Sequence, residues 1–173
     1  LHILPIINQL NIDQTHITTF DGGMGIVQFQ PNNYIPYAVD FDNGSIPNIW
    51  TDMPDAIASV ANFLHQHGWE KGVPWGFSVT IPEDHDELIR MSNRDLSHSL
   101  TFWEKQGVAF SHALTPAESS VKATLYLPNQ GTNATQGFLL TNNFRVLMRW
   151  NPSTVEALMI GLMATQLDEQ MSE

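Results

Sequence analysis

The sequence contains no cysteine among its 173 residues. This absence excludes disulfides, thiolate metal sites and a cysteine nucleophile. Positive charge is also scarce, because 7 Lys and Arg stand against 18 Asp and Glu and give a formal net charge of -11. A chain this acidic has no basic stripe for nucleic acid and is disfavoured at anionic membrane surfaces. Neutral polymers and small molecules are therefore the better suited ligands.

Long apolar runs are missing as well, since no stretch approaches the roughly 18 residues of a membrane span, and no signal peptide is visible at residue 1. The composition, with 42% hydrophobic and 14% charged residues, is typical of a globular chain. Apolar residues between Ile3 and Leu10 have helical spacing, but no capping residue precedes them. Two interpretations stay open: a short terminal helix with Pro5 in its first turn, or a helix that starts before Leu1.

The clearest predicted helix covers residues 52–66. Asp52 is suited to the N-cap position, Pro54 to the first turn and Gly68 to the C-cap. Its apolar positions predict one buried stripe: Ile57, Val60, Ala61 and Leu64.

A second helix is predicted at the C-terminus, with Asn151 as its cap and Pro152 at its first position. We expect its buried face to contain methionines as core filler, with these members: Val155, Leu158, Met159, Leu162 and Met163.

Residues 76–140 have a different pattern. The segments FSVTI (77–81) and ATLYL (123–127) alternate like strands, and a short helix ending near Gly107 lies between them. This predicts a small α+β insertion. Residues 138–150 are either a last strand or a turn that leads into the final helix.

Glycine is concentrated at residues 22, 23 and 25. Three glycines in four positions indicate a tight turn or a place where another group approaches the backbone closely. A phosphate-binding loop is disfavoured, because no strand precedes the glycines and no lysine follows them.

Three stretches together resemble the membrane-bound lytic murein transglycosylase B family, of the SLT domain 2 type, in its C-terminal portion. The first is GGMGIVQFQPNNY (22–34) with YAVDFD (37–42), similar to the family's G-A-M-G-x-x-Q-F-x-P-S-S-Y and Y-A-V-D-x-D. The second is DAIASVANFL (55–64), followed by HGW (67–69) and GVPW (72–75). The third is NF (143–144) through RWN (149–151).

The resemblance implies a mainly α, lysozyme-like fold of the α+β type, with a helical core and a small β-containing insertion. It divides the chain into residues 1–76 and 138–173 of the catalytic domain and an insertion at 77–137. It implies a periplasmic enzyme, associated with the outer membrane through an N-terminal lipid anchor that this sequence lacks. Such enzymes cleave the bond between N-acetylmuramic acid and N-acetylglucosamine without water and leave 1,6-anhydromuropeptides.

This chemistry needs one carboxyl group with a raised pKa, which first donates and then accepts a proton. A second carboxylate, as in retaining hydrolases, is not required. The family's catalytic glutamate lies well upstream of the glycine stretch, but only 21 residues precede Gly22 and the first glutamate is Glu70. We therefore expect no catalytic residue in this chain, and no cleavage by this chain alone.

The resemblance implies that the remaining site residues bind substrate. By position these are Thr19, Gln28, Phe63 and Asn143. We expect Gln28 and Asn143 to line one groove together with the glycine turn. Alternatives stay open, because Gln28 would also suit the backbone of the glycine turn and Phe63 would also suit the core.

A calcium loop is the one cofactor site that the resemblance implies. Asp40, Asp42 and Asp55 would supply oxygen ligands, with a backbone carbonyl near Ile46. The pattern departs from the family at residues 44 and 45, so we expect at most weak Ca²⁺ binding and no required cofactor. The alternative is an Asn-Gly turn with aspartates facing solvent.

Two functions remain in view. The first is a peptidoglycan lytic transglycosylase, whose partner is the glycan strand. The second is a catalytically inactive peptidoglycan-binding or scaffolding protein in an envelope assembly, which differences from the family at Asp21, Phe63 and Trp150 favour slightly.

Overall fold

The computed structural model describes residues 4–12, 22–44, 46–83, 86–92, 95–128 and 135–172. Its contacts divide the chain into two compact units, Leu1–His67 and Gly68–Glu173. The boundary between the units therefore falls where the predicted helix of residues 52–66 ends.

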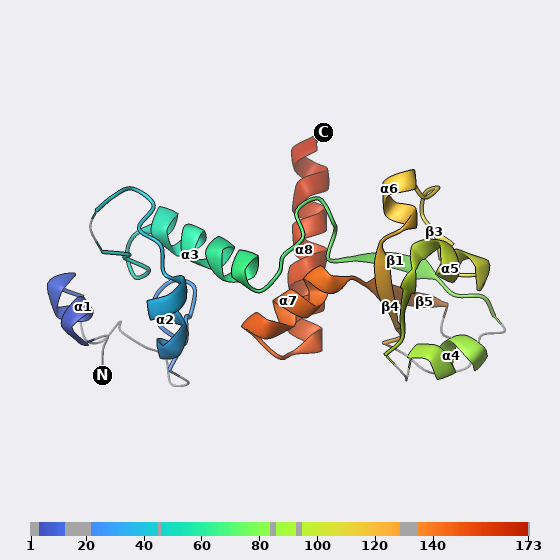
Figure 1. The fold of residues 1–173 in the computed structure, drawn as a ribbon, viewed down its shortest axis with the longest axis horizontal. Helices are drawn as coiled ribbons and strands as arrows, with labels where there is room; N and C mark the ends of the chain where they lie inside the picture. Colours follow the sequence, from blue (N-terminus) through green and yellow to red (C-terminus); the bar gives the residue numbers. More distant parts are fainter. Residues whose placement is uncertain are drawn as a thin grey trace. The chain divides into compact units, whose positions relative to one another are not determined.

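The first unit contains the helices α1 (Leu4–Gln9), α2 (Pro31–Tyr37) and α3 (Met53–Gln66) (Figure 1). The helix predicted over residues 52–66 is confirmed as α3. Its N-cap is Asp52, whose carboxylate accepts a hydrogen bond from the Asp55 N–H at 3.0 Å. This bond satisfies one of the amides that a helix start leaves without a partner.

The buried face of α3 differs from the predicted stripe. Ile57 is 61% exposed. Its neighbours Asp55 and Ser59 are buried instead, and they accept hydrogen bonds from the backbone N–H groups of Phe41 and Val39. Because these polar positions hold the preceding loop against the helix, apolar spacing alone assigns the wrong face.

The second unit is built on a five-stranded sheet with the strand order β2-β4-β5-β1-β3 (Figure 1). All its strand pairs are antiparallel. The strands are β1 (Gly76–Thr80), β2 (Ser97–Ser99), β3 (Ala109–Phe110), β4 (Lys122–Tyr126) and β5 (Gln136–Leu140). The strands predicted near residues 77–81 and 123–127 are thus present as β1 and β4. The strand β5 pairs with both of them. The segment that begins at residue 138 therefore starts within a strand of the sheet and does not follow after the sheet.

One face of the sheet carries the main core of the second unit. The helices α4 (Asp86–Ser92) and α5 (Leu100–Lys105) contribute Leu88 and Trp103 to it, while α6 (Pro116–Ser119) is short and has no buried residue. The indole Nε1 of Trp103 donates to the Ala123 carbonyl at 2.8 Å, so the ring is both buried and hydrogen-bonded. The other face presents Lys122, Thr124 and Tyr126 of β4, because successive side chains of a strand alternate between faces.

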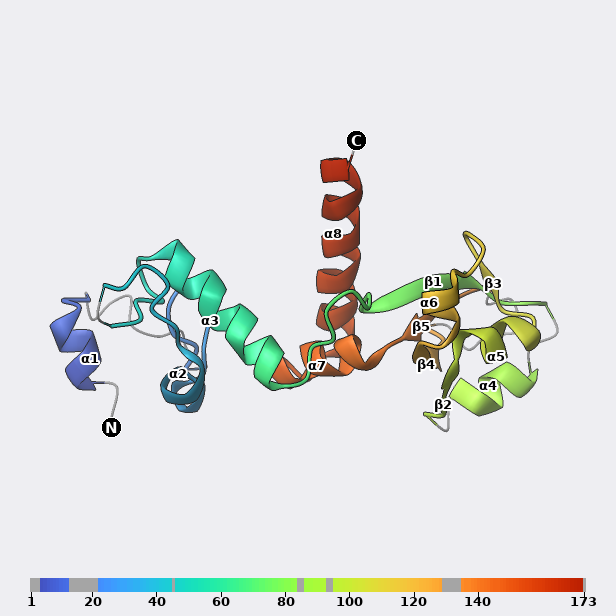
Figure 2. The ribbon, with the colours of Figure 1, turned by 45° about the horizontal axis from the view of Figure 1, so that its top comes forward.

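Two helices follow the sheet. α7 (Asn142–Trp150) starts directly after β5, and α8 (Thr154–Ser172) runs away from the end of α7 (Figures 1 and 2). The predicted buried face of α8 is wrong: Leu158 is buried, but Met163 is 67% exposed, and Val155, Met159 and Leu162 are exposed too. Within the described residues, no helix has both the length and the apolar content to cross a membrane.

The contact surface of α8 is instead formed by Ala157, Leu158 and Gly161 against Trp75. Ala157 and Leu158 share a cluster with Trp75 and Phe144, and the Trp75 Nε1 donates to the Thr165 Oγ1 at 3.0 Å. A Cβ atom on the buried Gly161 would lie 2.4 Å from the Trp75 ring. The indole therefore lies directly on the α8 backbone at residue 161.

This contact predicts an unusual response to a helix-favouring substitution. Replacing glycine by alanine inside a helix normally stabilises by up to about 1 kcal/mol. We expect Gly161→Ala to destabilise by about 1–3 kcal/mol, because the new methyl group overpacks against the indole. Urea unfolding measures the difference. In a Trp75→Leu background the same substitution should lose this penalty, and an unchanged or raised midpoint in the single variant would contradict the packing.

Candidate functional site

The glycine turn is closed by a bridge between Met24 and Phe29. The Met24 N–H donates to the Phe29 carbonyl at 2.8 Å, and the Phe29 N–H donates back at 3.0 Å. Gly25 has a φ of +66°, and a Cβ atom there would lie 2.4 Å from the Ile49 carbonyl oxygen. The close approach that the glycines predict is therefore made by the backbone at residue 49.

Gln28 lies at the exposed edge of this turn, with a φ of 55°. Its Nε2 donates to the Gly25 carbonyl at 2.8 Å, so the side chain supports the turn. A cavity of about 490 Å³ adjoins the same turn and is lined by residues of three segments: Leu10, Asn11, Ile12, Gly25, Ile26, Trp50 and Thr51. A sugar contact by Gln28 stays a prediction, and Thr19 lies outside the described residues.

Phe63 belongs to an aromatic cluster in the core of the first unit. Its ring stacks on His67 with centroids 4.0 Å apart and meets the edge of Tyr37 at 4.9 Å. The side chain is buried. In this conformation Phe63 packs against protein rings, as the core interpretation predicts, and does not present a face to a sugar.

Three carboxylates gather where α3 meets the loop after α2. Asp40, Asp42 and Asp55 each place one oxygen within 4.8 Å of the others. The Gly44 N–H lies 2.8 Å from the Asp40 Oδ1 and 3.2 Å from the Asp42 Oδ1. Carboxylate oxygens in such a group are the ligands that hard cations prefer, so the residues fit a calcium ion by chemistry and by spacing.

Asp55 is also the buried support of this loop. Its two oxygens accept the backbone N–H groups of Phe41 and Asn48, each at 2.7 Å. Burial, and then the negative charge of Asp55, raise the pKa of Tyr34 to about 12, and the Tyr34 hydroxyl donates to the Pro47 carbonyl. The loop is therefore held by protein hydrogen bonds.

Asn143 holds another irregular segment in the second unit. It is 0% exposed. Its Oδ1 accepts the Glu70 N–H at 2.7 Å, and its Nδ2 donates to the carbonyls of Glu70 at 2.9 Å and Val73 at 2.6 Å. Next to it, the Thr141 hydroxyl donates to the Pro74 carbonyl at 2.6 Å. The structure thus gives Asn143 a backbone-supporting role, where the sequence predicted a sugar contact at a groove.

Two adjoining cavities lie between α7 and the sheet face that carries Thr124. Their volumes are about 670 Å³ and 470 Å³, and Thr124, Leu140 and Arg145 line both. Lys122 and Glu70 line the larger cavity, and Arg149 lines the smaller one. The sequence assigns no site role to Lys122, Arg145 or Arg149, although basic residues are rare in this chain and their positions are informative for that reason.

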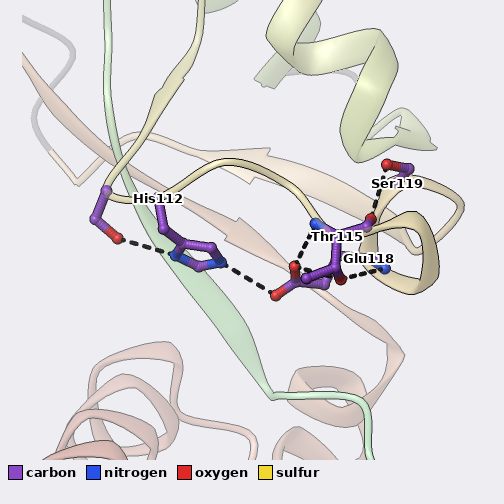
Figure 3. Close-up of polar contacts among 5 residues, drawn as sticks. His112, Thr115, Glu118 and Ser119 are labelled. Atoms are coloured by element: carbon purple, nitrogen blue, oxygen red, sulfur yellow. Dashed lines mark hydrogen bonds and ion pairs between the residues drawn. The ribbon is translucent and has the colours of Figure 1, made fainter.

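A further polar cluster links the loop after β3 to α6 (Figure 3). His112 lies between the Ser111 hydroxyl, 3.4 Å from its Nδ1, and the Glu118 carboxylate, 3.2 Å from its Nε2. The Thr115 hydroxyl and N–H both donate to Glu118 and lower its pKa. The Glu118 N–H donates in turn to the Thr115 hydroxyl at 3.3 Å, and with the bond from the Thr115 N–H this forms a capping box at the start of α6. The cluster is exposed, and its hydrogen bonds close a turn. This structural role explains the Ser-His-Glu arrangement without a catalytic relay that activates a nucleophile.

The fold is that of a lysozyme-like transglycosylase. The chain matches the Transglycosylase SLT domain family over residues 1–165 and belongs to this family. The predicted fold class, mainly helical with a β-containing part, is confirmed by solved structures. SltB3 from Pseudomonas aeruginosa, in complex with NAG-NAM-pentapeptide, has a TM-score of 0.83 and 33% identity over 95% of this chain and 44% of that chain.

Two Escherichia coli proteins are also similar. Lytic transglycosylase Slt35 in complex with calcium has a TM-score of 0.70 and 25% identity, over 99% of this chain and 52% of that chain. Membrane-bound lytic murein transglycosylase B of strain K12 is 52% identical over 54 residues, which are 31% of this chain and 15% of that protein. The chain thus spans about half the length of the solved relatives.

The role of Asn143 leads to a direct stability test. Asn143→Ala would leave the Glu70 N–H and two carbonyls buried without their partner, at a cost of about 1–3 kcal/mol. Asn142→Ala is the matched control, because Asn142 is exposed and its Nδ2 donates to the Gly68 carbonyl and to Glu70. We expect the control to stay within about 0.5 kcal/mol of wild type in urea unfolding. Equal losses in both variants would contradict the assignment.

Proposed function

We propose that this chain is part of a lytic transglycosylase and binds peptidoglycan for that enzyme. The enzyme would cleave the bond between N-acetylmuramic acid and N-acetylglucosamine without water and leave a 1,6-anhydro product. The observation that carries the proposal is the likeness to SltB3, which is bound to NAG-NAM-pentapeptide in a structure that covers 95% of this chain. SltB3 is also solved with NAG-anhNAM-pentapeptide, which has the form of such a product.

The residues of this chain would bind and position the glycan, and would not supply the proton. Among the described residues, Asp55 is the only buried carboxylate, and both of its oxygens already accept backbone hydrogen bonds. Glu70 is exposed, and its Oε1 accepts a hydrogen bond from Asn142 at 2.9 Å. Neither carboxyl is proposed as the general acid that the reaction needs.

A position in the cell envelope follows from the proposed substrate. Peptidoglycan lies in the periplasm of a bacterium with two membranes, and the Escherichia coli relative is named as membrane-bound. We therefore propose a periplasmic location with association to the outer membrane. A partner within an envelope assembly belongs to the same proposal.

The proposal predicts binding without cleavage by the 173-residue chain. We expect calorimetry to detect binding of the NAG-NAM disaccharide and of NAG-NAM-pentapeptide, and we expect purified sacculi to release no 1,6-anhydromuropeptides. Gln28→Ala should weaken disaccharide binding by about 0.5–1.5 kcal/mol, the net contribution of an ordinary hydrogen bond. Gln30→Ala is the control, because Gln30 is exposed and makes no side-chain cap bond at α2.

Three results would count against this proposal. Absence of binding to both ligands would contradict the proposed substrate. A lower melting temperature of Gln28→Ala with unchanged binding would assign Gln28 to the glycine turn alone. Release of 1,6-anhydromuropeptides would show that a carboxyl of this chain performs the proton transfer.

We further propose weak calcium binding by Asp40, Asp42 and Asp55. Three carboxylates within 4.8 Å of one another support it, and so does the calcium complex of the relative Slt35. Gly44 supplies no side-chain ligand in the middle of the loop, which lowers the expected affinity. The ion would bridge loop and helix, and no step of the reaction depends on it.

Calorimetry with CaCl₂ tests the calcium site. We expect a dissociation constant of about 0.1–1 mM, as in weak extracellular modules. Asp42→Asn should reduce binding further, since it removes one exposed carboxylate ligand, while Asp86→Asn in α4 should not change it. A sub-micromolar affinity, or equal effects of the two substitutions, would show that the ligand set is misassigned.

A further inference from the structure

We infer that the two cavities between α7 and the sheet bind the stem peptide of peptidoglycan through its charged groups. The inference rests on the proposed function, and it names a part of the substrate that this function leaves open. The cavities have about 670 Å³ and 470 Å³ and share Thr124, Leu140 and Arg145, so they form one continuous lining. Cavities of this size hold ligand-sized molecules.

The lining of the two cavities is rich in positively charged side chains. The chain has 7 basic residues and a net charge of -11, yet three of the seven line these two cavities: Lys122, Arg145 and Arg149. Neutral sugars give no reason for cations there. The stem peptide is the charged part of the proposed substrate, because it carries carboxylates and an amine.

The basic side chains of this lining keep donor groups that no described residue uses. No hydrogen bond or ion pair joins the charged groups of Lys122 and Arg149 to another described residue. Arg145 uses its Nη2 for Asp95, at 3.0 and 3.1 Å, and for the Thr124 hydroxyl, at 3.3 Å. Its Nε and Nη1 bond to no described residue, so three N–H donors remain for a ligand carboxylate.

The remaining lining suits the other groups of a peptide. Glu70 is exposed in the larger cavity and can pair with an ammonium group. Ser97 and Thr124 face each other across β2 and β4 and offer hydroxyls to peptide N–H and carbonyl groups. Phe144 and Met148 give the smaller cavity an apolar wall. Opposite charges at two places in one lining indicate a zwitterionic ligand rather than a simple anion.

The test compares three probes on the 173-residue chain: NAG-NAM with its lactyl carboxyl group amidated, so that the disaccharide is neutral, NAG-NAM-pentapeptide and the free pentapeptide. We expect the peptide-bearing disaccharide to bind more tightly than NAG-NAM. Arg145→Gln should weaken its binding about 3- to 10-fold, and Lys122→Gln about 2- to 3-fold, as expected for charge-assisted hydrogen bonds at partly exposed sites. Binding of NAG-NAM should not change in either variant. Lys105→Gln, at the end of α5, is the matched control.

A second variant gives an effect of opposite sign. Asp95→Asn removes the carboxylate that competes for Arg145, and asparagine is suited to the φ of 52° at this position. We expect it to tighten binding of the peptide-bearing probe about 2-fold or more. A purely structural Arg145–Asp95 pair predicts no such gain. A gain in affinity for Asp95→Asn would also show that the loss of affinity for Arg145→Gln comes from a lost ligand contact and not from misfolding.

The result that overturns the inference differs from the one that overturns the proposed function. The inference fails if NAG-NAM and NAG-NAM-pentapeptide bind equally and the free pentapeptide, at millimolar concentration, leaves the amide resonances of residues 122, 124 and 145 unshifted. The proposed substrate fails if neither disaccharide probe binds. Shifts at these three residues with the free pentapeptide support the inference even without sugar binding, and raising the salt concentration should reduce them.

Discussion

Buried polar side chains in the first turns of two helices hold the irregular backbone of both units. Asp55 of α3 accepts the N–H groups of Phe41 and Asn48, and Asn143 of α7 satisfies Glu70 and Val73. A buried backbone group without a partner costs about 1–3 kcal/mol. The backbone at Phe41 and Asn48, and that at Glu70 and Val73, is therefore held in place without strands or helices of its own. Each helix start thus fixes the chain that lies beside it.

The same interactions explain which parts of the fold the sequence predicts. Caps and alternation correctly place α3, β1 and β4, because these signals are local. The buried faces of the long helices are missed, since Asp55 and Ser59 are polar and Gly161 has no side chain to enter an apolar pattern. The pairing of β5 with β1 and β4 depends on contacts between distant segments, which periodicity does not report.

The family motifs predict the class of protein more securely than the role of each residue. Phe63 and Asn143 lie inside matching stretches, yet both side chains are buried and contact the chain itself. A family motif indicates only that a position accepts few residue types. Packing within the protein restricts the residue type as strongly as contact with a ligand does. For Gln28 both explanations stay open, because it supports the glycine turn from an exposed position. Only the three-dimensional neighbours of a residue separate these two explanations.

The composition of the chain gives information about charge that the family motifs do not give. The net charge of -11 makes the molecule as a whole repel polyanions. A cationic side chain of such a molecule attracts an anionic group only nearby, within the Debye length of about 8 Å at physiological salt. Lys122, Arg145 and Arg149 come from two elements, β4 and α7, that the sheet brings next to each other. Their separation in the sequence hides the cluster, and β5 creates it by joining β4 on one side and leading directly into α7 on the other. The strand β5, which the sequence left open as a strand or a turn, thus brings together three of the basic residues of this acidic chain.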